Sequence, residues 1–97
     1  MFVGSLELDI LLGDVRSLKQ KRSLVRRVVA ELRRQFEVSA AEVDHRDLHR
    51  RTTIGVAVVA SDAAHVADVL DSAEQLVAGR PELELLSSRR VLRGSDD

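Results

Sequence analysis

Carboxylate and imidazole side chains are concentrated in one short stretch near the middle of the chain. Five such residues fall within eight positions: Glu42, Asp44, His45, Asp47 and His49. Because carboxylate and imidazole groups are ligands for Mn, Fe or Zn ions, one interpretation of this cluster is a small metal-dependent hydrolase. The same stretch also contains Arg46, Arg50 and Arg51, which oppose a bound cation and can pair with the acids instead.

The expected backbone geometry also disfavours a metal site in this cluster. If a strand runs through it, alternation sends Glu42 and Asp44 to one face and His45 to the other. Internal ion pairing between the acids and the arginines explains the same residue types without any ligand. We therefore predict no metal and no other cofactor, with the metal-dependent hydrolase kept as an alternative.

The second group of residues with a recognisable chemistry is basic. Residues 14–36 contain eight Lys and Arg residues but only two acids, although the whole chain has a net charge of −1. At 100° per residue, four of the eight fall within about 60° of one another on a helix. These four are Lys19, Arg22, Arg26 and Arg33. Such a stripe contacts backbone phosphates with an affinity that depends on salt but not on base sequence. With Arg46 and Arg50, they make up the predicted anion-binding or nucleic-acid-binding set.

Most other chemistries lack the residues they need. The chain has no cysteine, which excludes disulfides, thiolate metal sites and a cysteine nucleophile. The glycines occur one at a time, so there is no phosphate-binding loop, and no serine lies in a nucleophile elbow. The only aromatic residues, Phe2 and Phe36, are assigned to the core, so stacking of bases on a sheet is not expected. We predict no catalytic residue and no enzyme activity.

Hydropathy patterns predict six secondary-structure elements that would position these groups. In order, they are a strand over 2–12, a helix from a Ser17 cap to about residue 36, strands over 38–44 and 52–60, a helix between Asp62 and Gly79, and a strand over 83–92. This order predicts an α+β fold, the ferredoxin-like βαββαβ sandwich, with a four-stranded antiparallel sheet and two helices on one face. We expect one domain over 1–93 and a polar tail over 94–97.

The sheet face without helices is predicted to be partly apolar. Val3 on the first strand and Gly55, Ala57 and Val59 on the third would share it, which indicates a homodimer through this face. Residues 61–79 contain acids but no Lys or Arg, in contrast with the basic first helix. A dimeric protein-interaction module whose acidic helix meets a basic partner is therefore a further alternative.

Two segments resemble the YlxP-like family, small bacterial proteins classed as a domain of unknown function. They read SLKQKR at 17–22 and AEVDHRDLHRRTTIGVAVV at 41–59. The resemblance covers nearly the whole chain and implies a ferredoxin-like fold. It also implies a setting, because genes of the family commonly lie among those for translation initiation, transcription antitermination and small-subunit assembly. Members often have Trp where this chain has His49, and an imidazole there would stack more weakly on a base or partner.

Together these observations predict a non-enzymatic cytoplasmic accessory protein. We expect it to associate with RNA or a ribosomal subunit, in ribosome maturation or translation, through the basic helix. No membrane is expected, because no apolar run approaches the roughly 20 residues that a membrane helix needs. Replacing Arg22, Arg26 and Arg33 with Gln is expected to abolish binding and leave the thermal midpoint nearly unchanged.

Overall fold

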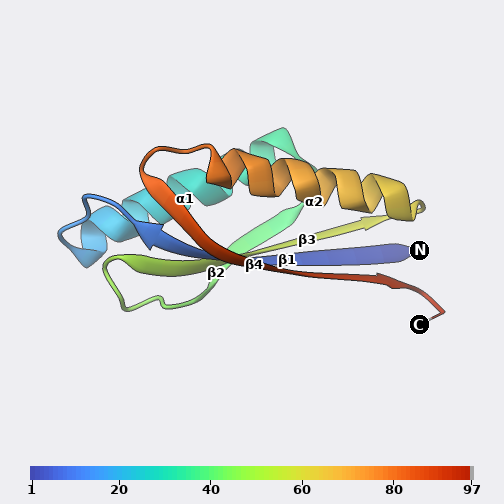
Figure 1. Cartoon of the computed structure of the whole chain (residues 1–97), viewed down its shortest axis with the longest axis horizontal. Helices are drawn as coiled ribbons and strands as arrows, with labels where there is room; N and C mark the ends of the chain where they lie inside the picture. The colour runs from blue at the N-terminus through green and yellow to red at the C-terminus, as the bar shows by residue number, and fades with distance from the viewer. Residues whose placement is uncertain (97) are drawn as a thin grey trace.

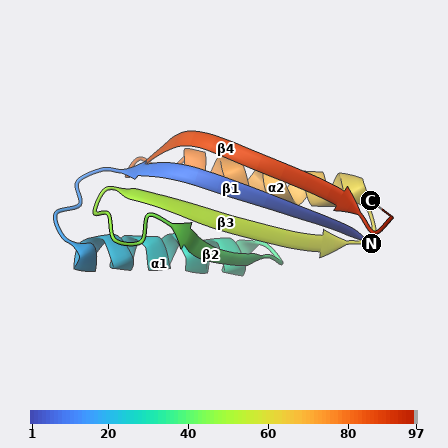
Figure 2. The same ribbon diagram turned by 90° about the horizontal axis from the view of Figure 1, so that it is seen from below.

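Two strand–helix–strand units combine in a two-layer structure. The computed structural model describes residues 1–96. Its elements are β1 (Phe2–Leu12), α1 (Leu18–Gln35), β2 (Ser39–Asp44), β3 (Arg51–Ala60), α2 (Ala63–Ala78) and β4 (Leu83–Gly94). The strands form one antiparallel sheet in the order β2-β3-β1-β4, and both helices cover the same face of it (Figures 1 and 2). This is the predicted ferredoxin-like α+β fold.

The core lies between the helices and the central strand β1. Alternate residues of β1 point towards the helices, and Leu6, Leu8 and Ile10 are fully buried there. Each helix contributes one apolar side, represented by Leu32 of α1 and Leu70 of α2. The period-2 pattern of the strand and the 3.6-residue pattern of the helices therefore meet in one hydrophobic layer.

Both helices begin at the predicted caps. The Ser17 hydroxyl accepts a hydrogen bond from the Gln20 amide at 3.1 Å, and the Asp62 carboxylate accepts one from the Ala64 amide at 2.9 Å. Gly79 ends α2, but with a φ of −82° it is right-handed and not the left-handed glycine that often ends a helix. No helix among the described residues is both long enough and apolar enough to cross a membrane.

β4 is longer than the predicted strand. It continues through Gly94 and stays paired with β1, and the Ser95 amide then donates to the Met1 carbonyl at 2.8 Å. The predicted tail over 94–97 is therefore wrong at its start, because backbone pairing continues into it. The last residue of that tail, Asp97, lies outside the described residues.

A carboxylate at the turn between α2 and β4 makes stability dependent on pH. A hydrogen bond from its own backbone amide, and a second from Arg80 at 3.0 Å, hold the pKa of Glu82 below its usual value. A lowered pKa contributes stability above the pKa of the unfolded chain, and this is lost as pH falls through the folded pKa. We expect Glu82→Gln to destabilise the protein slightly at pH 7 and less at pH 3, as measured by urea denaturation. An equal loss at both pH values would contradict this.

Candidate functional site

Between α1 and β2 lies a groove with a volume of about 640 Å³ and several arginines along its wall. Arg22, Arg26 and Arg33 come from the side of α1 that faces β2, and Arg46 comes from the loop after β2. The remaining lining residues are Val25, Val29, Ala41, Glu42 and Asp47. The groove thus combines a partly apolar surface with four guanidinium groups from two separate segments.

Positive charge exceeds negative charge in this groove. Arg22 and Arg26 are four residues apart on α1, so their Cβ atoms lie roughly 5–6 Å from each other on one side of the helix. The lining contains two acids, Glu42 and Asp47. The charge of Glu42 is neutralised by the buried Lys21, whose Nζ atom lies 2.7 Å from a Glu42 carboxylate oxygen. Only Asp47 is left to oppose the four arginines, which favours an anionic ligand.

Arg33 has a structural contact in addition to its place in the groove. Its Nη2 atom donates a hydrogen bond of 2.6 Å to the Ala40 carbonyl on the edge strand β2. Replacing it removes this link between α1 and β2. We therefore expect replacement of Arg33 to cost some stability, unlike replacement of Arg22 or Arg26, which form no such contact among the described residues.

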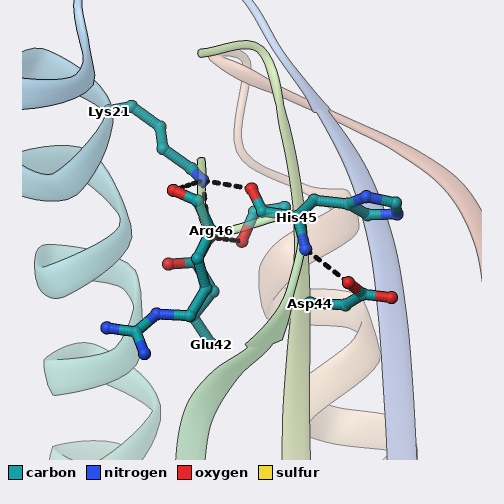
Figure 3. Close-up of polar contacts among 6 residues, drawn as sticks. Lys21, Glu42, Asp44, His45 and Arg46 are labelled. Atoms are coloured by element: carbon teal, nitrogen blue, oxygen red, sulfur yellow. Dashed lines mark hydrogen bonds and ion pairs between the residues drawn. The ribbon is translucent and has the colours of Figure 1, made fainter. Parts of the chain in front are cut away.

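Lys21 lies beneath the groove and is the centre of its polar contacts (Figure 3). Its side chain is 0% exposed, and its Nζ atom lies 2.7 Å from a carboxylate oxygen of Glu42. It also donates to the carbonyl oxygens of His45 at 2.6 Å and Arg46 at 3.0 Å. The three protons of the ammonium group therefore have three acceptors, as a buried charge requires.

The Lys21–Glu42 pair joins three elements. Glu42 lies on β2 and also accepts a 2.6 Å hydrogen bond from the hydroxyl of Thr52, a fully buried residue of β3. The same carboxylate oxygen of Glu42 thus contacts the Lys21 ammonium group of α1 and accepts a hydrogen bond from the Thr52 hydroxyl of β3. This arrangement fixes the position of β2 against the helix and sets the width of the groove.

The loop after β2 is shaped so that two successive carbonyls reach Lys21. His45 has a φ of 60°, in the left-handed region, and its amide donates to the Asp44 carboxylate at 2.7 Å. The Leu48 amide donates back to the His45 carbonyl at 3.2 Å. Since Lys21 also holds the Arg46 carbonyl, the backbone that carries the Arg46 side chain is anchored at the groove.

Glu42 and Asp44 do not share a face of the sheet, contrary to the prediction from alternation. The register shifts between them, so that Glu42 lies opposite Ile54 and Asp44 lies opposite Thr53. Adjacent residues of β3 face opposite sides. The irregularity at this point sends Glu42 to Lys21 and Asp44 to the other face.

The acids and arginines of residues 42–51 also do not pair with one another. Glu42 pairs with Lys21, Arg51 binds both carboxylate oxygens of Asp9 at 2.8 Å, and Arg50 donates to the Leu12 carbonyl at 3.0 Å. The predicted internal ion pairing is therefore wrong, because α1 and β1 supply the partners. Arg50 is also not part of the groove. Lys19 is likewise outside it, in a hollow beside Gly13.

Of the five candidate metal-binding residues, Glu42 and Asp44 are separated by the register shift, whereas Glu42 and Asp47 both line the groove. Among residues 1–96, no three His, Asp or Glu side chains converge in a way that could hold a metal ion. The acidic α2 is also partly neutralised within the chain, since Arg90 lies 2.7 Å from Asp71 and 3.7 Å from Glu74. The described residues therefore offer more support for an anion site than for a cation site.

Lys21 is one of the eight basic residues of 14–36 but is not among the predicted site residues. A signal for it was present, because Lys21 falls on the same side of the helix as Leu24, Val25 and Val28, all of which are buried. A lysine within an apolar stripe indicates a buried charge that needs an acidic partner. The helical periodicity that predicts the arginine stripe thus also places Lys21 among the apolar residues of the helix.

Fold and site together define a small α+β protein with an arginine-lined groove built on a buried ion pair. The chain belongs to the family described as Protein of unknown function (DUF503), whose profile matches residues 3–90. It is also similar to "Uncharacterized protein YlxP" of Bacillus subtilis (strain 168), with 29% identity over 87 residues. That similarity covers 90% of this chain and 95% of the relative, and the resemblance to YlxP-like proteins is confirmed.

Proposed function

We propose that this protein is a non-enzymatic accessory protein that binds RNA, free or within a ribosomal subunit, through the α1–β2 groove. The observation that carries the proposal is the convergence of Arg22, Arg26, Arg33 and Arg46 on one groove. Guanidinium groups match phosphate geometry well, and several of them along a groove follow a phosphate backbone. The ribosomal setting is supported by the genes that accompany the YlxP-like family.

Recognition through the backbone is favoured over recognition of bases on the sheet. Phe2 and Phe36 are partly buried and pack against the core, so neither provides a stacking platform on the sheet surface. Stacking on aromatic residues is the usual means by which sheet surfaces bind single-stranded RNA. The groove arginines, in contrast, require only phosphates and a strand that fits between α1 and β2.

Two arginine pairs on the same helix allow a matched test of the groove. Arg22→Gln with Arg26→Gln changes the groove, whereas Arg27→Gln with Arg34→Gln removes the same charge from arginines that line other hollows. Gln and Arg have similar helix propensities, so we expect both double variants to fold. Binding of a fluorescein-labelled 20-nucleotide RNA is measured by anisotropy between 50 and 200 mM salt.

We expect the groove variant to bind at least tenfold more weakly at 50 mM salt and the control variant less than threefold more weakly. The slope of log K against log salt should become shallower by about 1–2 for the groove variant, because two phosphate contacts are lost. Cosedimentation with small ribosomal subunits should also be weaker for the groove variant than for the control variant. The proposed groove would be refuted if both variants lost the same RNA affinity. It would also be refuted if the RNA affinity of the wild type did not depend on salt concentration.

A further inference from the structure

The acid Asp47 lies among the arginines of the α1–β2 groove. Glu42, the other acid of the lining, is held by Lys21 and Thr52. Among residues 1–96, in contrast, the Asp47 carboxylate forms no ion pair or hydrogen bond, although four arginines line the same groove. A carboxylate and a guanidinium group that meet usually bind each other, often through two hydrogen bonds. Asp47 and the arginines therefore line one groove without contacting one another, which leaves both free for a ligand.

The backbone around Asp47 is held in place by contacts on both sides of it. The Nζ atom of Lys21 donates to the carbonyls of His45 and Arg46, the two residues that precede Asp47. The amide of Leu48, the residue that follows, donates to the His45 carbonyl at 3.2 Å and closes a turn around Asp47. The side chain itself is exposed on this turn. The turn therefore presents the carboxylate at the groove without using it as a structural contact.

A ligand that contacts both Asp47 and its neighbour Arg46 must carry a hydrogen-bond donor close to an anion. An ionised carboxylate has only acceptors, so it repels a phosphate and binds O–H or N–H groups. Arg46 and Asp47 are consecutive, so the guanidinium and carboxylate groups start from Cα atoms about 3.8 Å apart. In RNA, the 2′-hydroxyl is on the ribose carbon next to the one that carries the 3′-phosphate. RNA therefore presents a donor beside an anion at every nucleotide, whereas DNA presents the anion alone.

We propose that Asp47 accepts a hydrogen bond from a ribose 2′-hydroxyl and makes the groove selective for RNA over DNA. Asp47 acts in this way only if the groove binds RNA, so its role rests on the proposed function. A hydrogen bond from a hydroxyl group to a charged carboxylate is short and strong, and it offsets the repulsion between Asp47 and the phosphates. With DNA the repulsion remains and the hydrogen bond is missing. Asp47 therefore weakens the binding of DNA more than the binding of RNA.

The 2′-hydroxyl matches Asp47 better than a donor on a base does. The N–H groups of bases differ among the four nucleotides, and they lie on the far side of the sugar from the phosphates. Binding through them would depend on base sequence, whereas phosphate contacts from a row of arginines do not. A 2′-hydroxyl is present at every nucleotide, so a strand of any sequence can contact Asp47 and the arginines together.

Three fluorescein-labelled 20-nucleotide oligouridines that differ only at the 2′ position test the role of Asp47. They carry a 2′-hydroxyl, a 2′-hydrogen or a 2′-fluorine. The fluorine keeps the sugar shape of RNA but has no proton to donate, so it separates hydrogen bonding from sugar shape. By anisotropy at 50 mM salt, we expect the wild type to bind the hydroxyl form at least tenfold more tightly than either of the other two forms.

Two substitutions of Asp47 and one matched control assign the preference to its carboxylate. Asp47→Ala should bind the three oligouridines within threefold of one another, because it loses the acceptor and also stops repelling the two forms without a hydroxyl. Asp47→Asn keeps an acceptor without the charge, so we expect it to retain a three- to tenfold preference. Asp68→Ala removes the same charge from an exposed position of α2 and should keep the preference of the wild type.

The outcomes distinguish a failure of the Asp47 role from a failure of the groove. If the wild type binds all three oligouridines equally, or if Asp47→Ala keeps the tenfold preference, the inference is overturned although the groove still binds RNA. Binding of the 2′-fluoro form as tightly as the hydroxyl form also overturns it, because sugar shape then explains the preference. If Arg22→Gln with Arg26→Gln leaves the affinity for the hydroxyl form unchanged, the proposed groove fails and the inference fails with it.

Discussion

Replacing Lys21 with Met is expected to lower the free energy of unfolding by about 3–5 kcal/mol, because it leaves the Glu42 carboxylate buried without its partner. The side chains have similar lengths, so loss of packing contributes little. The carbonyls of His45 and Arg46 also lose their donor, and an unsatisfied buried acceptor costs about 1–3 kcal/mol. Urea denaturation, monitored by circular dichroism, measures the change in the free energy of unfolding. The change shows as a shift in the urea midpoint with no change in the slope of free energy against urea concentration.

A second substitution separates the ion pair from the loop anchor. Adding Glu42→Gln to Lys21→Met removes the unpaired charge, so the double variant should recover part of the lost stability. It should stay about 1–3 kcal/mol below wild type, because neither new side chain donates to the two loop carbonyls. Full recovery would show that the anchor contributes nothing. If the groove binds RNA as proposed, the double variant should also bind it more weakly, since the backbone of Arg46 is released.

Replacing Gly4 with Ala is expected to destabilise the protein by about 1–3 kcal/mol through overpacking. Gly4 lies on β1 under α2, where a Cβ atom would collide with Val66 and lie 2.9 Å from the Cδ1 atom of Leu70. Either α2 must therefore move away from the sheet, or the side chains of Val66 and Leu70 must adopt strained rotamers. Thermal denaturation and urea denaturation both report this loss.

Gly55 and Val66 supply the controls for this prediction. Gly55→Ala is the same change on the neighbouring strand, but its close contact is the exposed side chain of Val43, which can rotate away, so we expect a loss of less than about 1 kcal/mol. Val66→Ala makes room for the new methyl group. The double variant Gly4→Ala with Val66→Ala should lose less stability than the sum of the single changes. Simple additivity would show that the two side chains do not compete for one space.

The fold was predictable because its elements depend on local patterns. The alternation around Leu6 and Leu8 determines β1, and the positions of Ser17 and Asp62 determine where the helices begin. The irregularity between Glu42 and Asp44 and the left-handed His45 were not predictable. Both occur where loop carbonyls contact Lys21, a residue that is distant in sequence.

The candidate site was predictable only in part for the same reason. Helical periodicity correctly placed Arg22, Arg26 and Arg33 on one side of α1. The helix alone does not reveal where β2 lies, and this position decides which basic residues line the groove and which, such as Lys19, do not. Ion-pair partners were least predictable, because each charged residue had several candidates and the tertiary fold selected among them.

The contact between Arg33 and the Ala40 carbonyl also affects how the sheet can grow. β2 is an edge strand, and an edge with free backbone groups is a template for pairing with other chains. Arg33 occupies one of these groups, and the register shift makes β2 irregular. At the opposite edge, Arg89, Arg90 and Arg93 of β4 place like charges where another β4 would pair. We therefore expect both edges to resist open-ended, amyloid-like extension, and Arg33 contributes to this whether or not the groove holds a ligand.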